Sequence, residues 1–166
     1  MNLNVILSKI GISTSLTQDF SLLIFMALAS FIYGMLLGKH KLMTVLINIY
    51  VSFAVITVLP KEIVLDYNTK IIIFLIILVA LTLMSRRFFD VSFSGAGSSF
   101  LWKVFLVSFI QIGMVLSIIF SLMPKKEALV YISANAYDYL VSGWALLIWM
   151  ALPLVFMFFF YRKNRY

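Results

Sequence analysis

Apolar and polar residues alternate in long blocks along this chain, and five of the blocks are almost entirely apolar. They cover residues of about 20–38, 42–59, 70–85, 100–123 and 139–161. A helix needs about 20 apolar residues to cross a hydrocarbon core of about 30 Å, and the first, second, fourth and fifth blocks meet that requirement. A membrane-spanning strand would show strict alternation over about ten residues, which no block does. The pattern therefore predicts an all-α integral membrane protein, a bundle of about five transmembrane helices.

The third block is the shortest, because its uninterrupted apolar part extends only from Ile71 to Met84. Lys70 and Arg86 flank it, and their long side chains can reach the membrane interfaces and lengthen the span. Its β-branched residues would favour a strand in water, but an open strand in lipid leaves backbone groups without hydrogen bonds. We expect a third transmembrane helix, with a re-entrant or half-inserted segment as the alternative.

Residues 1–18 form a separate N-terminal segment ahead of a single transmembrane helical domain over residues 19–166. The segment has apolar residues at helical spacing: Leu3, Ile6, Leu7 and Ile10. This spacing predicts a short amphipathic helix on the outer surface of the membrane, and a frayed tail is the alternative.

Residues 125–138 show a similar pattern between the fourth and fifth blocks. Their apolar face consists of Leu129, Ile132 and Ala136, and three charged residues precede it. We expect a second outer-surface helix there. Residues 90–99 are instead rich in glycine and serine, which predicts a flexible linker between the third and fourth spans.

Charged residues are distributed unevenly between the two sides that five spans define. One side carries eight basic residues and one acidic residue, namely Lys39, Lys41, Arg86, Arg87, Lys103, Arg162, Lys163, Arg165 and Asp90. The other side carries five of each sign, namely Lys9, Lys61, Lys70, Lys125, Lys126, Asp19, Glu62, Asp66, Glu127 and Asp138. Basic residues in short loops stay cytoplasmic, which predicts an outer N-terminus and a cytoplasmic C-terminus.

The formal net charge of +7 therefore lies at one membrane surface. Anionic lipid headgroups neutralise such a surface, so we expect the lipid bilayer as a partner and no nucleic acid. The expected location is the cytoplasmic (inner) membrane, as a multi-pass protein.

Few residues on which enzyme chemistry depends are present in the sequence. The absence of cysteine excludes disulfides, thiolate metal sites and cysteine nucleophiles, and the one histidine, His40, lies in a basic loop. No charged residue or histidine is near the middle of a predicted span, where proton relays and paired-aspartate proteases need one. We expect no catalytic residue, no cofactor and no metal site.

Small residues recur at every fourth position in the first span, at Ser30, Gly34 and Gly38. Such a stripe allows another helix to approach closely. The pattern leaves open whether that helix belongs to the same chain or to a second copy in a homo-oligomer.

Two side-chain amides lie within predicted spans. Asn48 belongs to a stripe of polar residues in the second span, and Gln111 lies in the fourth span near its inner third. We expect both to form hydrogen bonds to neighbouring helices, because a buried amide in a membrane must find a partner. The fourth span also has a stripe formed by Gly113, Ser117 and Ser121.

The region of about residues 19–123 resembles the colicin V production protein family, which are small bacterial inner-membrane proteins. The resemblance rests on Asp19 at the start of the first span, a turn with Gly34, Gly38 and Lys39 at its end, and a glycine–serine loop before the fourth span. It implies an inner-membrane protein connected with export or envelope homeostasis, and those four residues would be carried over. The chain differs from the family in having a fifth span and no basic residue between Asp90 and Lys103.

The sequence thus predicts a non-enzymatic membrane protein, a scaffold or accessory subunit of an export or envelope-homeostasis system with a membrane protein partner. The alternative is a small-solute transporter or the substrate-binding membrane subunit of one, with an uncharged pocket built from Asn48, Gln111 and Trp144. A hole-forming lysis protein is a weaker third hypothesis, because five long spans exceed what such proteins need.

Overall fold

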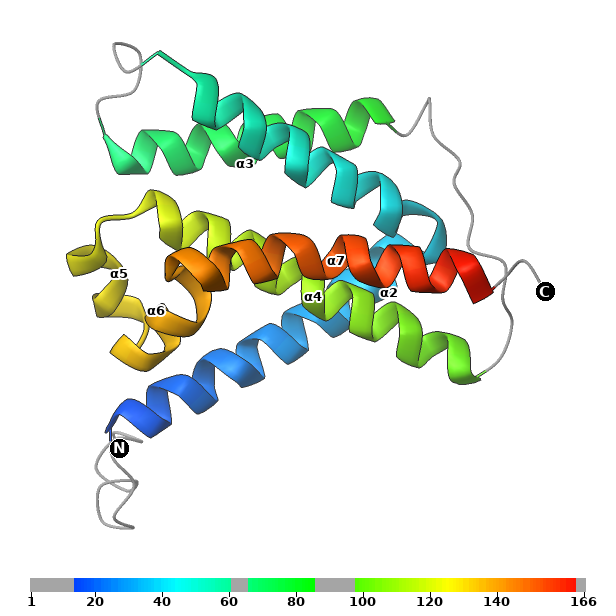
Figure 1. Cartoon of the computed structure of the whole chain (residues 1–166), viewed down its shortest axis with the longest axis horizontal. Helices are drawn as coiled ribbons and strands as arrows, with labels where there is room; N and C mark the ends of the chain where they lie inside the picture. Colours follow the sequence, from blue (N-terminus) through cyan, green and yellow to red (C-terminus); the bar gives the residue numbers. More distant parts are fainter. Residues whose placement is uncertain (1–13, 61–65, 86–97, 164–166) are drawn as a thin grey trace.

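The structure, a computed structural model, describes residues 14–60, 66–85 and 98–163, and every regular element in these ranges is a helix. The elements are α2 (Thr14–Val58), α3 (Tyr67–Ser85), α4 (Ser98–Leu122), α5 (Lys125–Tyr131), α6 (Ala134–Val141) and α7 (Gly143–Lys163) (Figure 1). The predicted N-terminal surface helix lies outside the described residues, as does the glycine–serine loop up to residue 97. The prediction of an all-helical chain is confirmed for the described residues.

Helix α2 contains the first two predicted spans without a loop between them. Its 45 residues include two stretches long and apolar enough to cross a membrane, Leu16–Leu36 and Lys41–Val58. Figure 1 shows the two halves running back from a bend at the end of the molecule opposite the start of α2. Gly38 lies between the halves, and glycine is a common site of helix bending.

The third and fourth predicted spans are each one helix. Helix α3 has 19 residues and α4 has 25, and both are long and apolar enough to cross a membrane. The shortest predicted span is therefore a full-length apolar helix, with Lys70 inside its first turn and Ser85 at its end.

The fifth predicted span, 139–161, is wrong at its beginning. Residues 139–141 belong to α6, and α7 starts at Gly143 after a bend of 55° between the two helices. The break is at Ser142, whose φ of −54° and ψ of 148° lie outside the helical region. Together α6 and α7 form a bent pair that is long and apolar enough to be one broken span or a re-entrant loop.

The single surface helix predicted over residues 125–138 is also wrong, because two short helices, α5 and α6, occupy this region. Ile132 and Ser133 between them have extended backbones, and the Ser133 side chain caps the start of α6. Ile132 and Ala136 are buried as predicted, but Ala128 is buried in place of Leu129. The apolar face therefore packs onto the bundle, in a cluster that also includes Phe120 and Leu140.

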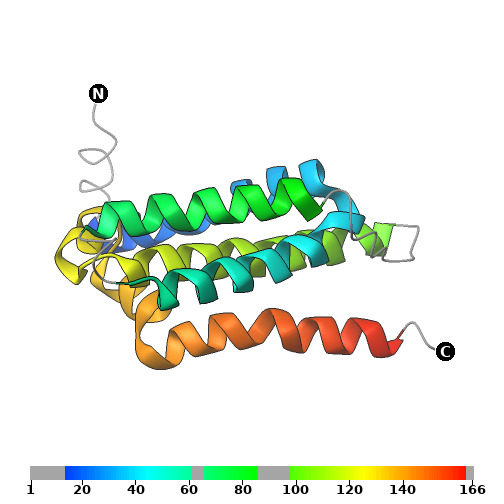
Figure 2. The same cartoon turned by 90° about the horizontal axis from the view of Figure 1, so that it is seen from above.

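Helix α4 is central to the bundle, because it contacts α2, α3, α6 and α7. Figure 2 shows α7 along one side of the molecule, away from α3. The main apolar cluster forms where the second half of α2 meets α3 and α4, and consists of Val45, Leu46, Ile49, Phe74, Met114 and Ile118. Most large apolar side chains on the first half of α2 and on α3 are instead exposed on the outside of the bundle.

Candidate functional site

The stripe of small residues on α2 packs against α4 of the same chain. A Cβ atom built at Gly34 would lie 2.9 Å from Ser108 Oγ and 3.3 Å from Val104 Cγ1. Ser30, one turn earlier, is fully buried, and its hydroxyl donates a hydrogen bond to the Met26 carbonyl. Glycine at position 34 therefore allows the two helices to approach closely, as the spacing predicts.

The other two predicted residues of this region, Gly38 and Lys39, lie in the bend of α2. Their backbone is helical, but their side-chain surroundings lie outside the described part of the chain. At Gly34, the partner of the stripe is therefore α4 of the same chain. The prediction for Gly38, the last residue of the stripe, stays a prediction.

Asn48 joins the second half of α2 to α3, as a predicted inter-helix amide should. Its Nδ2 donates to Thr82 Oγ1 over 3.3 Å, and its Oδ1 accepts a hydrogen bond from Ser85 Oγ over 3.2 Å. Thr82 also donates to the Leu78 carbonyl, at 2.7 Å. Both ends of the buried amide are thus satisfied, which is the condition for a buried polar group to be tolerated.

Gln111 is fully buried and joins α4 to the second half of α2. Its Nε2 donates to the Leu42 carbonyl over 2.7 Å. Its Oε1 has no hydrogen-bond partner among the described residues. The prediction of an inter-helix amide is therefore confirmed for the donor end alone.

Three further buried polar atoms have no partner in the described part of the chain: Tyr33 Oη, Thr44 Oγ1 and Ser108 Oγ. Ser108 lies one turn before Gln111 on α4 and against Gly34 of α2. A buried polar atom without a partner costs about 1–3 kcal/mol. Two of the unpartnered groups, Ser108 and Gln111, therefore lie on α4 where it packs on α2.

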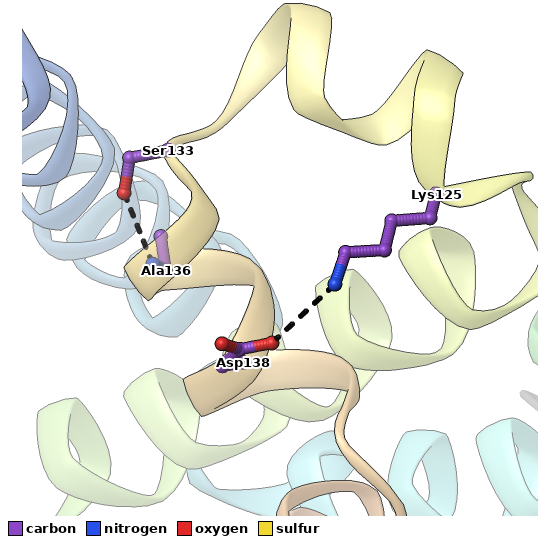
Figure 3. A network of polar contacts seen from close by, with 4 residues as sticks. All are labelled: Lys125, Ser133, Ala136 and Asp138. Carbon is purple, nitrogen blue, oxygen red and sulfur yellow. Dashed lines mark hydrogen bonds and ion pairs between the residues drawn. The ribbon is translucent and has the colours of Figure 1, made fainter.

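Asp19 connects the start of α2 with α6. The Ser133 hydroxyl donates a hydrogen bond to Asp19 Oδ1. Ser133 Oγ also accepts a hydrogen bond from the Ala136 amide over 3.0 Å (Figure 3). One buried serine therefore caps α6 and holds it to α2, across 114 residues of sequence.

A second contact in this region links Lys125 of α5 with Asp138 of α6, whose charged groups are 4.0 Å apart. Lys125 Nζ also lies 5.3 Å from the centre of the Tyr137 ring. Because both charged side chains are largely exposed, this ion pair adds little to stability.

The contacts of α7 were not predicted from the sequence. A Cβ atom at Gly113 would lie only 2.2 Å from the Trp149 ring, so this glycine makes room for an indole of α7. Trp149 Nε1 donates to the Tyr139 carbonyl over 3.1 Å, and Tyr50 donates from α2 to the Met150 carbonyl. The stripe with Gly113 marks a close approach, but its spacing does not say which helix approaches.

The three residues predicted for the uncharged pocket of the transporter alternative have different surroundings. Asn48 is bound to α3, Gln111 to the Leu42 carbonyl, and Trp144 is 80% exposed at the start of α7. Among the described residues, no three His, Cys, Asp or Glu side chains lie close enough to hold a metal ion.

Comparisons with protein-family models, with curated proteins and with solved structures gave no match. The resemblance to the colicin V production protein family therefore stays a prediction from Asp19, Gly34, Gly38 and Lys39. Of these four residues, the structure gives contacts to Asp19 and Gly34.

Replacing Ser133 by alanine is expected to lower the free energy of unfolding by about 1–2 kcal/mol, because α6 loses its N-cap and its contact with Asp19. Thermal unfolding of the purified protein in detergent measures the change. Ser133→Thr keeps the hydroxyl and should remain close to wild type. An equal loss in the threonine variant would show that the hydrogen bonds are not the cause.

Replacing Gln111 by leucine is expected to change the free energy of unfolding by less than about 1 kcal/mol. The variant loses the hydrogen bond to the Leu42 carbonyl, but also removes a buried oxygen without a protein partner. Asn48→Leu is the matched comparison and should cost about 1–3 kcal/mol, because both ends of its amide are paired. A larger loss for Gln111→Leu than for Asn48→Leu would contradict this ranking.

Proposed function

We propose that this chain is a multi-pass protein of the cytoplasmic membrane that serves as a non-enzymatic scaffold or accessory subunit of an export or envelope-homeostasis system. Four helices are long and apolar enough to cross a membrane, and α6 with α7 adds a fifth, bent candidate. Exposed apolar surface of this extent is rare on soluble monomers and is typical of lipid or protein contact.

The observation that carries the proposal is the contrast between the inside and the outside of the bundle. The amide of Asn48 and the donor end of Gln111 hold helices of this chain together. Of the residues in α3, only Phe74 is buried, and the large apolar side chains of Ile72, Ile76, Val79 and Leu83 are exposed. A protein built in this way presents apolar helix faces to lipid and to other membrane proteins.

The placement of charge and aromatic side chains supports an outer N-terminus. The contact between Asp19 and Ser133 brings the start of α2 and α6 to one end of the molecule, and α7 ends at the other (Figure 1). Tyr139 and Trp144 are strongly exposed near the first end and Trp102 near the second, as interfacial aromatic residues would be. We assign the basic end to the cytoplasm, against anionic lipid.

Cysteine labelling tests this orientation, because the natural chain has no cysteine. Lys126 and Lys41 are exposed at opposite ends of the proposed spans. A membrane-impermeant thiol reagent should label Lys126→Cys in intact cells, and Lys41→Cys only after the membrane is permeabilised. The opposite result would invert the orientation, and labelling of both variants in intact cells would contradict the span arrangement.

Affinity purification from the native membrane tests the function. The tagged protein should retain one protein partner in near-stoichiometric amount, identified by mass spectrometry. An unrelated multi-pass protein with the same tag and detergent controls for proteins that are merely co-solubilised. Purification without any partner would overturn the accessory-subunit proposal.

A small-solute transporter is the second candidate, favoured by the unpartnered polar atoms of Ser108 and Gln111 inside the bundle. Neutral solutes are bound by such uncharged groups in otherwise apolar surroundings. A small molecule retained through the purification described above, in the absence of a protein partner, would favour this candidate.

A further inference from the structure

Two buried polar atoms without a partner among the described residues, Ser108 Oγ and Gln111 Oε1, lie on α4 where it packs on α2. Ser108 and Gln111 are both 0% exposed and lie three residues apart, on the same face of α4. Gly34 of α2 faces Ser108, and the Gln111 amide donates to the Leu42 carbonyl of α2. We name Ser108 and Gln111 the α2–α4 polar site.

The hydrogen-bonding capacity of this site is specific. The Gln111 amide already uses its Nε2 for the Leu42 carbonyl, so only its Oε1 acceptor is left. The Ser108 hydroxyl can donate or accept a hydrogen bond. A small uncharged molecule that donates to Gln111 Oε1 and forms a hydrogen bond with the Ser108 hydroxyl would satisfy both groups.

Water meets these requirements with the fewest atoms. Buried water molecules make about two to four hydrogen bonds each, usually to polar groups that have no other partner, and the site offers two such groups. An unsatisfied polar group costs several kcal/mol within a membrane, because bulk water is absent there. We propose that the α2–α4 polar site binds water inside the bundle, a proposal that rests on the membrane-spanning arrangement.

Tyr33 Oη and Thr44 Oγ1, the other two unpartnered atoms, belong to α2 and are not included in the site. The contact between α2 and α3 is closed at Asn48 by direct hydrogen bonds to Thr82 and Ser85.

Solid-state NMR of the intact protein in lipid vesicles tests the proposal by transfer of magnetisation from water to side-chain amides. The chain contains two glutamines, Gln18 and Gln111, so selective labelling with 15N-glutamine gives two side-chain signals. Gln18 is exposed and provides the positive control. Asn48, a buried amide with both ends paired, provides the dry control after labelling with 15N-asparagine.

We expect transfer from water to Gln111 at a rate within about threefold of Gln18, and at least about tenfold faster than to Asn48. Ser108→Val should slow the transfer to Gln111. Ser117→Val should leave it unchanged, because Ser117 is equally buried on α4 but its hydroxyl is bound to the Leu140 carbonyl. Transfer to Gln111 as slow as to Asn48, or equal effects of the two serine variants, would overturn the proposal.

Transfer of magnetisation from lipid chains in the same sample distinguishes failure of the site from failure of the membrane arrangement. The outward-facing residues Ile72, Ile76 and Val79 of α3 should receive magnetisation from lipid. Strong lipid transfer to α3 with a dry Gln111 would reject the water site alone. Absence of lipid transfer would reject the membrane-spanning arrangement on which the site depends.

Discussion

Replacing Gly113 by alanine is expected to destabilise the bundle by about 2–3 kcal/mol, within the range for overpacked interiors. The added Cβ would lie 2.2, 2.5 and 2.8 Å from three atoms of the Trp149 ring. The indole is rigid, and its Nε1 is hydrogen-bonded to the Tyr139 carbonyl, so the whole ring must move. Helix propensity alone predicts the opposite sign, since alanine is favoured over glycine by about 1 kcal/mol within a helix.

A double-mutant cycle with Trp149→Leu measures whether the indole is responsible. Gly113→Ala should cost much less when leucine replaces Trp149, giving a coupling energy of about 1–2 kcal/mol in thermal or denaturant unfolding. Gly143→Ala is the matched control, because nothing lies within 4 Å of a Cβ at that glycine. A stabilised Gly113→Ala variant, or no coupling to Trp149, would contradict the packing of α7 on α4.

Replacing Gly34 by isoleucine is expected to separate α2 from α4 and to lower the free energy of unfolding by about 3 kcal/mol or more. A β-branched side chain has few rotamers in a helix and would meet both Ser108 and Val104. Gly34→Ala should cost about 1 kcal/mol or less, because the Ser108 hydroxyl can rotate away from a single methyl group.

The partner of Gly34 can be identified by a compensating change on α4. Ser108→Gly should recover part of the stability that Gly34→Ile loses, measured by thermal unfolding and by the amount of protein accumulated in the membrane. The oligomeric state in detergent should be the same for all of these variants, since the contact lies within one chain. Unchanged stability and assembly of Gly34→Ile would show that no helix packs at this glycine.

The contacts at Gly34 and Gly113 show what residue spacing can and cannot predict about helix packing. Positions four residues apart share a helical face, so spacing correctly marks Gly34 and Gly113 as points of close approach. Spacing does not say which helix approaches, because that depends on how the chain folds back on itself. The indole opposite Gly113 belongs to Trp149, which lies 36 residues further along the sequence. No local sequence pattern connects the two positions.

The hydropathy pattern also did not predict the helical breaks after α5 and α6, for a related reason. Apolar residues continue through Ile132 and from Tyr139 into the last block, so hydropathy predicts uninterrupted helices there. Ser133 instead leaves the helix to cap α6, where its hydroxyl also reaches Asp19. Serine competes with backbone hydrogen bonds in this way wherever a tertiary partner is within reach.

The sequence by itself determined the helical class and the first four apolar spans, because length and hydropathy are sums over neighbouring residues. Only the tertiary structure decided the bend of α2, the break between α6 and α7, and the central position of α4. It also decided which buried polar groups are satisfied, Asn48 at both ends and Gln111 at one. A hydrogen bond requires two groups at about 3 Å, and for residues tens of positions apart that distance exists only after the helices have packed.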